Sequence, residues 1–212
     1  MMVVRVSTNL TIDGVTIAIS GLTQADLDAI HARLAELLAQ PPSRVKNRDA
    51  IASAFRYGIE ICPEINPSDL WHHVIYREFV RSIKDVRRVN DPKESWVRSS
   101  GDAFELFLQD YYTARLSADG VWLTALFTDK ESTAALEEMN IHDEVGGSKL
   151  DLAIRTATQI IGGIHAKVSL AERVSDDVPA SQIMMRRSYL SALVTLDVKS
   201  FPPSMTVSDT RS

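Results

Sequence analysis

The chain has 212 residues, of which 45% are hydrophobic and 24% charged. This composition is typical of a folded globular protein and excludes the disordered and fibrous classes. A single cysteine, Cys62, excludes an internal disulfide and a zinc site built from several cysteines. No apolar run approaches the about 18 residues of a membrane span, and the N-terminus lacks the apolar stretch of a signal peptide. We therefore expect a cytoplasmic protein without a membrane partner.

Charge is distributed unevenly along the sequence, although the formal net charge is only −5. Residues 81–98 hold six basic against three acidic side chains, whereas residues 129–144 hold six acidic against one basic. The negative average argues mildly against a nucleic-acid partner. The local excess of basic residues nevertheless leaves one surface suited to a polyanion.

The first part of the chain predicts a β-hairpin followed by helices. Alternating apolar residues on both sides of Asp13-Gly14 favour the hairpin. Thr23 is expected to cap a helix that ends before Pro41. Apolar residues at helical spacing predict three more helices: one over 49–57, one beginning at Ser68 and one beginning at Ser99 or Ser100.

From residue 121 onward the apolar spacing becomes that of strands. Strands are predicted over 121–127, 149–155, 160–169 and 192–198. Helices are predicted over 131–139 and from Pro179 to about Tyr189. Gly162-Gly163 is expected to mark a bulge or close packing rather than a phosphate-binding loop. Together these elements indicate an α/β fold with a mixed central sheet flanked by helices.

A candidate site lies on the hairpin that the strands 149–155 and 160–169 would form. If the turn lies near residue 158, Asp151 comes opposite residues 165–167, and its carboxylate shares one face with His165 and Lys167. Glu172 follows five residues after Lys167. Carboxylates can hold Mg²⁺, and a nearby lysine can stabilise charge that develops on a phosphate. An exposed ion pair on an ordinary hairpin would have the same pattern, so the spacing alone leaves both interpretations open.

Longer segments carry a resemblance to a known family. Residues 95–106, 148–154, 162–181 and 196–200 together resemble type II restriction endonucleases of the BsaWI kind, which have the PD-(D/E)xK fold and cut within a CCGG core. The resemblance covers roughly residues 60–203. It implies a restriction-endonuclease-like core over 61–203. An N-terminal hairpin and helical segment over 1–60 precedes this core, and the polar residues 204–212 are expected to form a flexible tail.

The resemblance also implies roles for individual residues. Asp151 takes the position of the metal-binding aspartate and Lys167 that of the catalytic lysine, while His165 stands where an acidic residue is usual. Glu172 would supply the second carboxylate, and Glu105 would complete the metal site through a water. The residues expected to read DNA bases are Arg173, Asp176, Asp177 and Ser181. The implied cofactor is Mg²⁺, and the implied partner is double-stranded DNA bound by a homodimer at a palindromic site.

Two alternatives remain open at the level of sequence. Asp197-Val-Lys199 is a literal DxK motif, so Lys199 competes with Lys167 for the catalytic role. The chain also ends soon after this motif with a polar stretch, which suggests a truncated relative that binds DNA or assembles without cutting. A fold relative with a repair function, selective for DNA structure or ends, is a further possibility.

Overall fold

The computed structural model describes residues 7–12, 15–145, 150–168 and 174–196. The chain divides into two compact units, the first ending at Ser100 and the second spanning Gly101–Leu196. The domain limits at residues 60 and 203 that the family resemblance implies stay a prediction. Within the described ranges, no helix has the length and apolar character needed to cross a membrane.

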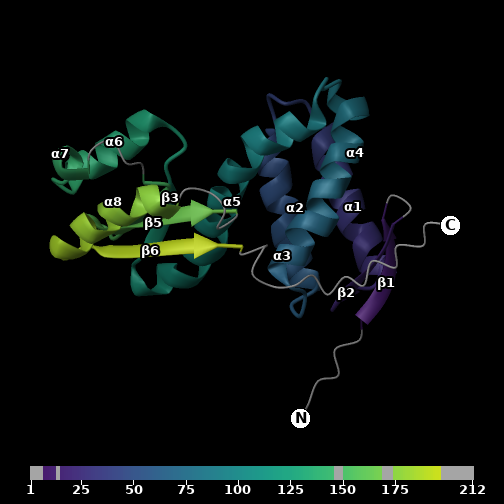
Figure 1. The fold of residues 1–212 in the computed structure, drawn as a ribbon, viewed down its shortest axis with the longest axis horizontal. Helices are drawn as coiled ribbons and strands as arrows, with labels where there is room; N and C mark the ends of the chain where they lie inside the picture. The colour runs from purple at the N-terminus through teal and green to yellow at the C-terminus, as the bar shows by residue number, and fades with distance from the viewer. Residues whose placement is uncertain (1–6, 13–14, 146–149, 169–173, 197–212) are drawn as a thin grey trace, which may run out of the picture. The chain divides into compact units, whose positions relative to one another are not determined.

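The first unit begins with the predicted hairpin (Figure 1). Strands β1 (Ser7–Ile12) and β2 (Val15–Ser20) pair antiparallel, with Ile12 opposite Val15. Helix α1 (Gln24–Ala39) follows, and Thr23 forms a capping box with Asp26 as expected of a threonine at this position. The apolar stripe of α1 is buried, which confirms the predicted helix.

Four further helical segments follow in the first unit. These are α2 (Asn47–Ile61), α3 (Pro67–Asp69), the π-helical η1 (Leu70–Ile75) and α4 (Tyr76–Arg87). The next helix, α5 (Pro92–Leu116), begins earlier than predicted. Asp91 Oδ1 accepts hydrogen bonds of 3.0 Å from the backbone N–H groups of Lys93 and Glu94, so the helix starts directly after this acidic cap.

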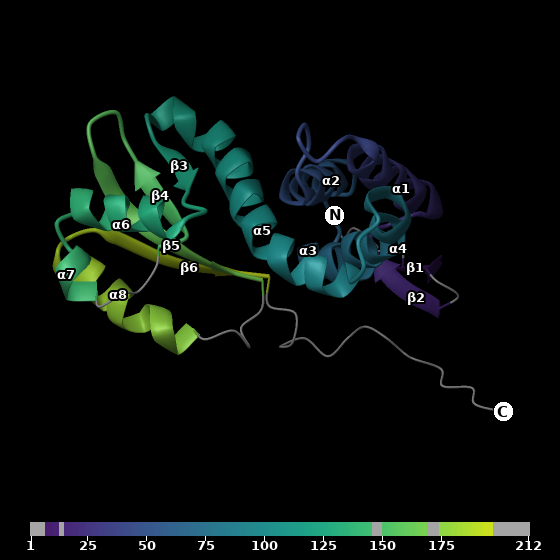
Figure 2. The ribbon, with the colours of Figure 1, turned by 90° about the horizontal axis from the view of Figure 1, so that it is seen from above.

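The second unit holds a four-stranded mixed sheet, which confirms the predicted fold class (Figure 2). Its strands run in the order β3 (Trp122–Ala125), β4 (Leu152–Arg155), β5 (Ile160–Lys167) and β6 (Leu190–Thr195). Neighbouring strands are antiparallel except β5 and β6, which are parallel. The remaining elements are η2 (Ser117–Asp119), α6 (Asp129–Glu138), α7 (His142–Val145) and α8 (Val174–Arg186).

Helix α8 differs from its prediction, because it begins at Val174 and carries Pro179 inside. Proline lacks an N–H, so the helix forgoes the hydrogen bond that residue 179 would donate. Burial compensates: Ala180, Ile183 and Met184 pack in one apolar cluster with Ala153 of β4 and with residues of α6 and α7. Tertiary packing therefore overrides the local preference of proline for a helix start.

Helix α5 also closes one edge of this sheet. Gln109 Oε1 accepts a 2.8 Å hydrogen bond from the backbone N–H of Ala125, and Thr113 Oγ1 accepts one of 2.9 Å from that of Leu123. Both N–H groups belong to β3, which has β4 as its only strand neighbour within the described sheet. Two side chains of α5 thus accept hydrogen bonds from N–H groups at this edge of the sheet. Without them, these N–H groups would be available to pair with another strand.

The two glycines of β5 allow close packing, as the sequence predicted. A Cβ on Gly162 would lie 2.4 Å from the carbonyl oxygen of Leu190 in β6, and one on Gly163 would lie 2.2 Å from Leu150 Cδ1. The first of these clashes is with backbone, so no side-chain rotation relieves it. Gly162 therefore permits β6 to approach β5.

We expect Gly162→Ala to lower the free energy of unfolding by about 1–3 kcal/mol, because the strands must separate to accept the methyl group. Gly101→Ala is the matched control. No atom lies within 4 Å of a Cβ at this exposed position in α5, so we expect a gain of about 0.5–1 kcal/mol. Urea denaturation followed by circular dichroism measures both. Equal stability of Gly162→Ala and the unsubstituted protein would contradict the packing argument.

Candidate active site

Asp151 is held in place by three hydrogen bonds, made by its own carbonyl group, by its neighbour Leu150 and by its carboxylate. Asp151 directly precedes β4, and its carbonyl oxygen accepts a 2.9 Å hydrogen bond from the N–H of Leu126. The preceding residue, Leu150, donates its N–H to the buried Ser132 Oγ at 2.8 Å. Across the hairpin, Asp151 Oδ2 accepts a 2.8 Å hydrogen bond from the N–H of Ala166. The side chain is therefore held against β5 rather than free to rotate.

An ammonium group lies between two carboxylates at this point of the hairpin. Lys167, the last residue of β5, places Nζ 3.3 Å from Asp151 Oδ2 and 3.4 Å from Asp177 Oδ2. Asp177 comes from the first turns of α8. The three side chains are 13–19% exposed. This site is thus a partly buried cluster joining β4, β5 and α8, and differs from an exposed ion pair.

The face of the hairpin that carries Asp151 is covered rather than open to solvent. Leu152 lies opposite Ile164, so Asp151, Ala153, His165 and Lys167 share the other face. Ala153 is fully buried and His165 is 1% exposed. His165 Nδ1 lies 3.3 Å from Asp177 Oδ1. The face that Asp151 shares with His165 and Lys167, as predicted from the sequence, therefore lies between the sheet and α8.

Two carboxylates control the charge state of Lys167. Burial by itself lowers the pKa of the ammonium, but the charges of Asp151 and Asp177 outweigh this effect, so the pKa lies above its ordinary value. The group stays protonated at neutral pH and serves as a donor and positive charge, not as a base. Its contribution to folding is complete below the unfolded pKa of about 10.4 and is lost only as pH rises through the raised value.

The other residues predicted for the site lie in different places. Ser181 follows Asp177 by one turn of α8 and is half-buried. Glu105 lies on α5 and is partly exposed. Glu172, Arg173, Asp197 and Lys199 fall outside the described residues, as does the side chain of Asp176. Sequence reasoning assigned Asp177 to base reading and did not foresee its contact with Lys167.

The spacing of residues in the sequence could have predicted that Asp177 faces the sheet. Asp177, Ala180 and Met184 are spaced at i, i+3 and i+7, so they share one face of α8. Ala180 and Met184 pack in the apolar cluster against the sheet. The same spacing therefore directs the carboxylate of Asp177 toward β5.

The cluster supplies two carboxylates for a cation, but not a complete protein cage. Within the described ranges, no group of three or more His, Cys, Asp and Glu side chains is placed to hold a metal ion. Mg²⁺ commonly uses one or two carboxylates and takes its other ligands from water and substrate phosphate. Asp151 and Asp177 supply oxygen donors of that kind, and one oxygen of each lies against the same ammonium group, that of Lys167.

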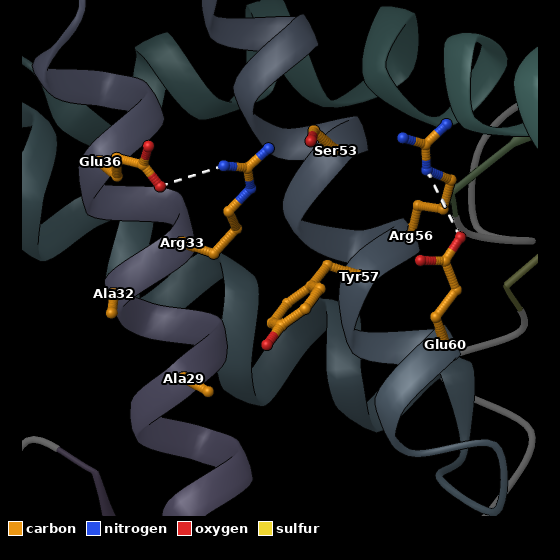
Figure 3. A pocket seen from close by; sticks show the side chains of 8 residues that line it. All are labelled: Ala29, Ala32, Arg33, Glu36, Ser53, Arg56, Tyr57 and Glu60. Atoms are coloured by element: carbon orange, nitrogen blue, oxygen red, sulfur yellow. Dashed lines mark hydrogen bonds and ion pairs between the residues drawn. The ribbon is translucent and has the colours of Figure 1, made fainter.

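A hollow of about 630 Å³ in the first unit offers less chemistry. It lies between α1 and α2, and Figure 3 shows its charged side chains directed toward one another. Arg33 pairs with Glu36 at 3.0 Å, and Arg56 faces Glu60 at 3.7 Å. Small side chains and a tyrosine complete the lining, namely Ala29, Ala32, Ser53 and Tyr57. Its charges are balanced locally, which favours the cluster at Lys167 as the reactive site.

Comparison with solved structures identifies the class of fold. The crystal structure of the specific complex of the restriction endonuclease AgeI with DNA matches this chain with a TM-score of 0.79 and 42% sequence identity. The match covers 94% of this chain and 73% of that one. The chain is therefore a member of the restriction endonucleases, specifically of the family of AgeI.

A curated relative agrees with this assignment. The type II restriction enzyme AgeI of Thalassovita gelatinovora is 50% identical over 170 residues, which make up 76% of this chain and 59% of the relative. The chain thus spans less than two thirds of that enzyme's length. No family model matches the chain.

A second solved structure is a more distant match. The pre-specific complex of restriction endonuclease BsaWI with DNA matches 80% of this chain and 70% of its own, but with a TM-score of only 0.36 and 20% identity. The matches to AgeI confirm the broader expectation that the chain belongs to the restriction endonuclease family.

Proposed function

We propose that this protein is a type II site-specific deoxyribonuclease that hydrolyses phosphodiester bonds of double-stranded DNA. The carrying observation is the cluster of Asp151, Lys167 and Asp177 in a chain that is 42% identical to an endonuclease solved on DNA. A partly buried ammonium between carboxylates suits phosphate chemistry, since it stabilises negative charge that develops during hydrolysis. The proposed target is a palindromic sequence with a CCGG core.

Among the residues that the structure describes, we propose Asp151 and Asp177 as ligands of a divalent cation. The proposed ion is Mg²⁺, which prefers carboxylate oxygens. Such an ion would neutralise the scissile phosphate and activate a water molecule. The fixed carboxylate of Asp151 would set the position of the site, and Lys167 would donate to a non-bridging phosphate oxygen. Glu172 and Glu105 keep their proposed roles as second carboxylate and water-mediated ligand.

We propose that residues at the start of α8 and in the segment before it recognise DNA bases. Arg173 can donate two hydrogen bonds to one guanine, and a carboxylate such as that of Asp176 can accept from cytosine. Ser181, one turn beyond Asp177, is proposed as a further contact. A palindromic site calls for a symmetric protein, so we propose that a homodimer binds it.

The direct test is incubation of the purified protein with Mg²⁺ and a plasmid that carries palindromic CCGG-containing sites. We expect discrete fragments with constant ends, and no cleavage in EDTA. A gel shift without fragments, in the presence of Mg²⁺, would instead identify a DNA-binding relative that does not cut. Cleavage that depends on free ends or mismatches, and not on sequence, would indicate a repair nuclease.

A further inference from the structure

His165 occupies an unusual place in this cluster. It lies on β5 two residues before Lys167, is 1% exposed, and directs Nδ1 to within 3.3 Å of Asp177 Oδ1. The other carboxylate oxygen of Asp177 faces Lys167 Nζ at 3.4 Å. The two oxygens of Asp177 are therefore approached by two neighbouring side chains of one strand. Each oxygen of the carboxylate therefore has a polar side chain within 3.4 Å.

The contact also joins two elements that local sequence does not connect. Asp177 belongs to α8, whereas His165 belongs to β5. The backbone hydrogen bonds within the sheet and within the helix do not determine how α8 is positioned relative to β5. A polar contact at the first turns of α8 can set the rotation of the helix, while the buried Ala180 and Met184 fix its distance from the sheet.

We propose that His165 is a positioning residue, which holds the Asp177 carboxylate in the orientation that receives a divalent cation. The inference rests on the proposed function, in which Asp177 is a ligand. Partners that orient metal-binding side chains typically contribute 10–100-fold, roughly, in metal affinity or activity. In this proposal His165 would act through Asp177 and would not itself be a ligand.

Two substitutions of His165 separate a positioned donor from simple packing. In His165→Asn the side-chain NH₂ lies near the place of Nδ1, whereas in His165→Gln it lies near the place of Nε2. Both variants are polar and similar in size to histidine. We expect His165→Gln to weaken Mn²⁺ binding by roughly tenfold, measured by electron paramagnetic resonance on the DNA-free protein. We expect His165→Asn to stay within about threefold of the unsubstituted protein.

Cleavage supplies an independent measurement. His165→Gln should raise the Mg²⁺ concentration for half-maximal cleavage by a similar factor, with DNA affinity unchanged. In an Asp177→Asn background, His165→Gln should add no further loss of Mn²⁺ affinity, since the residue acts through Asp177. Circular dichroism verifies that each variant is folded. If His165→Gln fails to fold, His165→Leu replaces it, because leucine has no donor and should cause the same loss of Mn²⁺ affinity, whereas unchanged affinity would overturn the inference.

The outcomes separate the inference from the function on which it rests. Equal Mn²⁺ affinity of His165→Gln and the unsubstituted protein overturns the inference, as do equal losses in the Asn and Gln variants. Additive losses in the Asp177→Asn background overturn it too. If the unsubstituted protein binds Mn²⁺ through Asp177 but cuts no DNA, the proposed function fails while the role of His165 stands.

Discussion

Asp151→Ala is expected to reduce DNA cleavage by at least about 10³-fold while leaving DNA binding within a few-fold of the original, because a metal-held phosphate contributes several kcal/mol to the transition state. Asp151 is the best-fixed carboxylate of the cluster: its Oδ2 accepts the 2.8 Å hydrogen bond from Ala166. Single-turnover cleavage of an oligonucleotide duplex measures the rate, and a gel shift measures binding.

Controls make this prediction specific. Asp151→Asn keeps the side-chain volume and an oxygen for the N–H of Ala166, so it should fold and yet remain inactive. Asp119→Ala, at an exposed position in η2, should cut at the original rate. Cleavage retained by both Asp151 variants would remove this residue from the proposed mechanism.

The second large effect is expected for Lys167→Ala, with a loss of about 10²–10³-fold in the cleavage rate. The substitution removes the positive charge between Asp151 and Asp177, so these carboxylates attract a cation more strongly than before. We therefore expect that additional Mg²⁺ does not restore the rate. The same single-turnover assay, repeated over a range of Mg²⁺ concentrations, measures this effect.

Substitutions of two other lysines test whether the loss of cleavage is specific to Lys167. Lys130→Ala, exposed on α6, should behave like the unsubstituted protein. Lys199→Ala tests the competing DxK motif, and we expect at most a small loss. Full activity in Lys167→Ala together with none in Lys199→Ala would transfer the catalytic role to Lys199.

Much of the local structure follows directly from the sequence. Asp13-Gly14 between alternating apolar residues predicted the pairing of β1 with β2, and Thr23 predicted the start of α1. The contact of Asp151 with Lys167 was also accessible, because a short turn and the period of two fix which residues meet across a hairpin. The earlier start of α5 was readable too: Asp91-Pro92 is an acidic cap followed by a proline.

Only the tertiary structure decided how α8 meets the sheet. Its start before Pro179 and the contacts of Asp177 with Lys167 and His165 depend on burial of Ala180 and Met184 against the sheet. Backbone hydrogen bonds determine a strand pair from nearby residues, but they do not determine the rotation of a helix over that pair. That rotation is set by side-chain packing between distant segments, which is why the sequence alone did not predict the contact of Asp177 with Lys167.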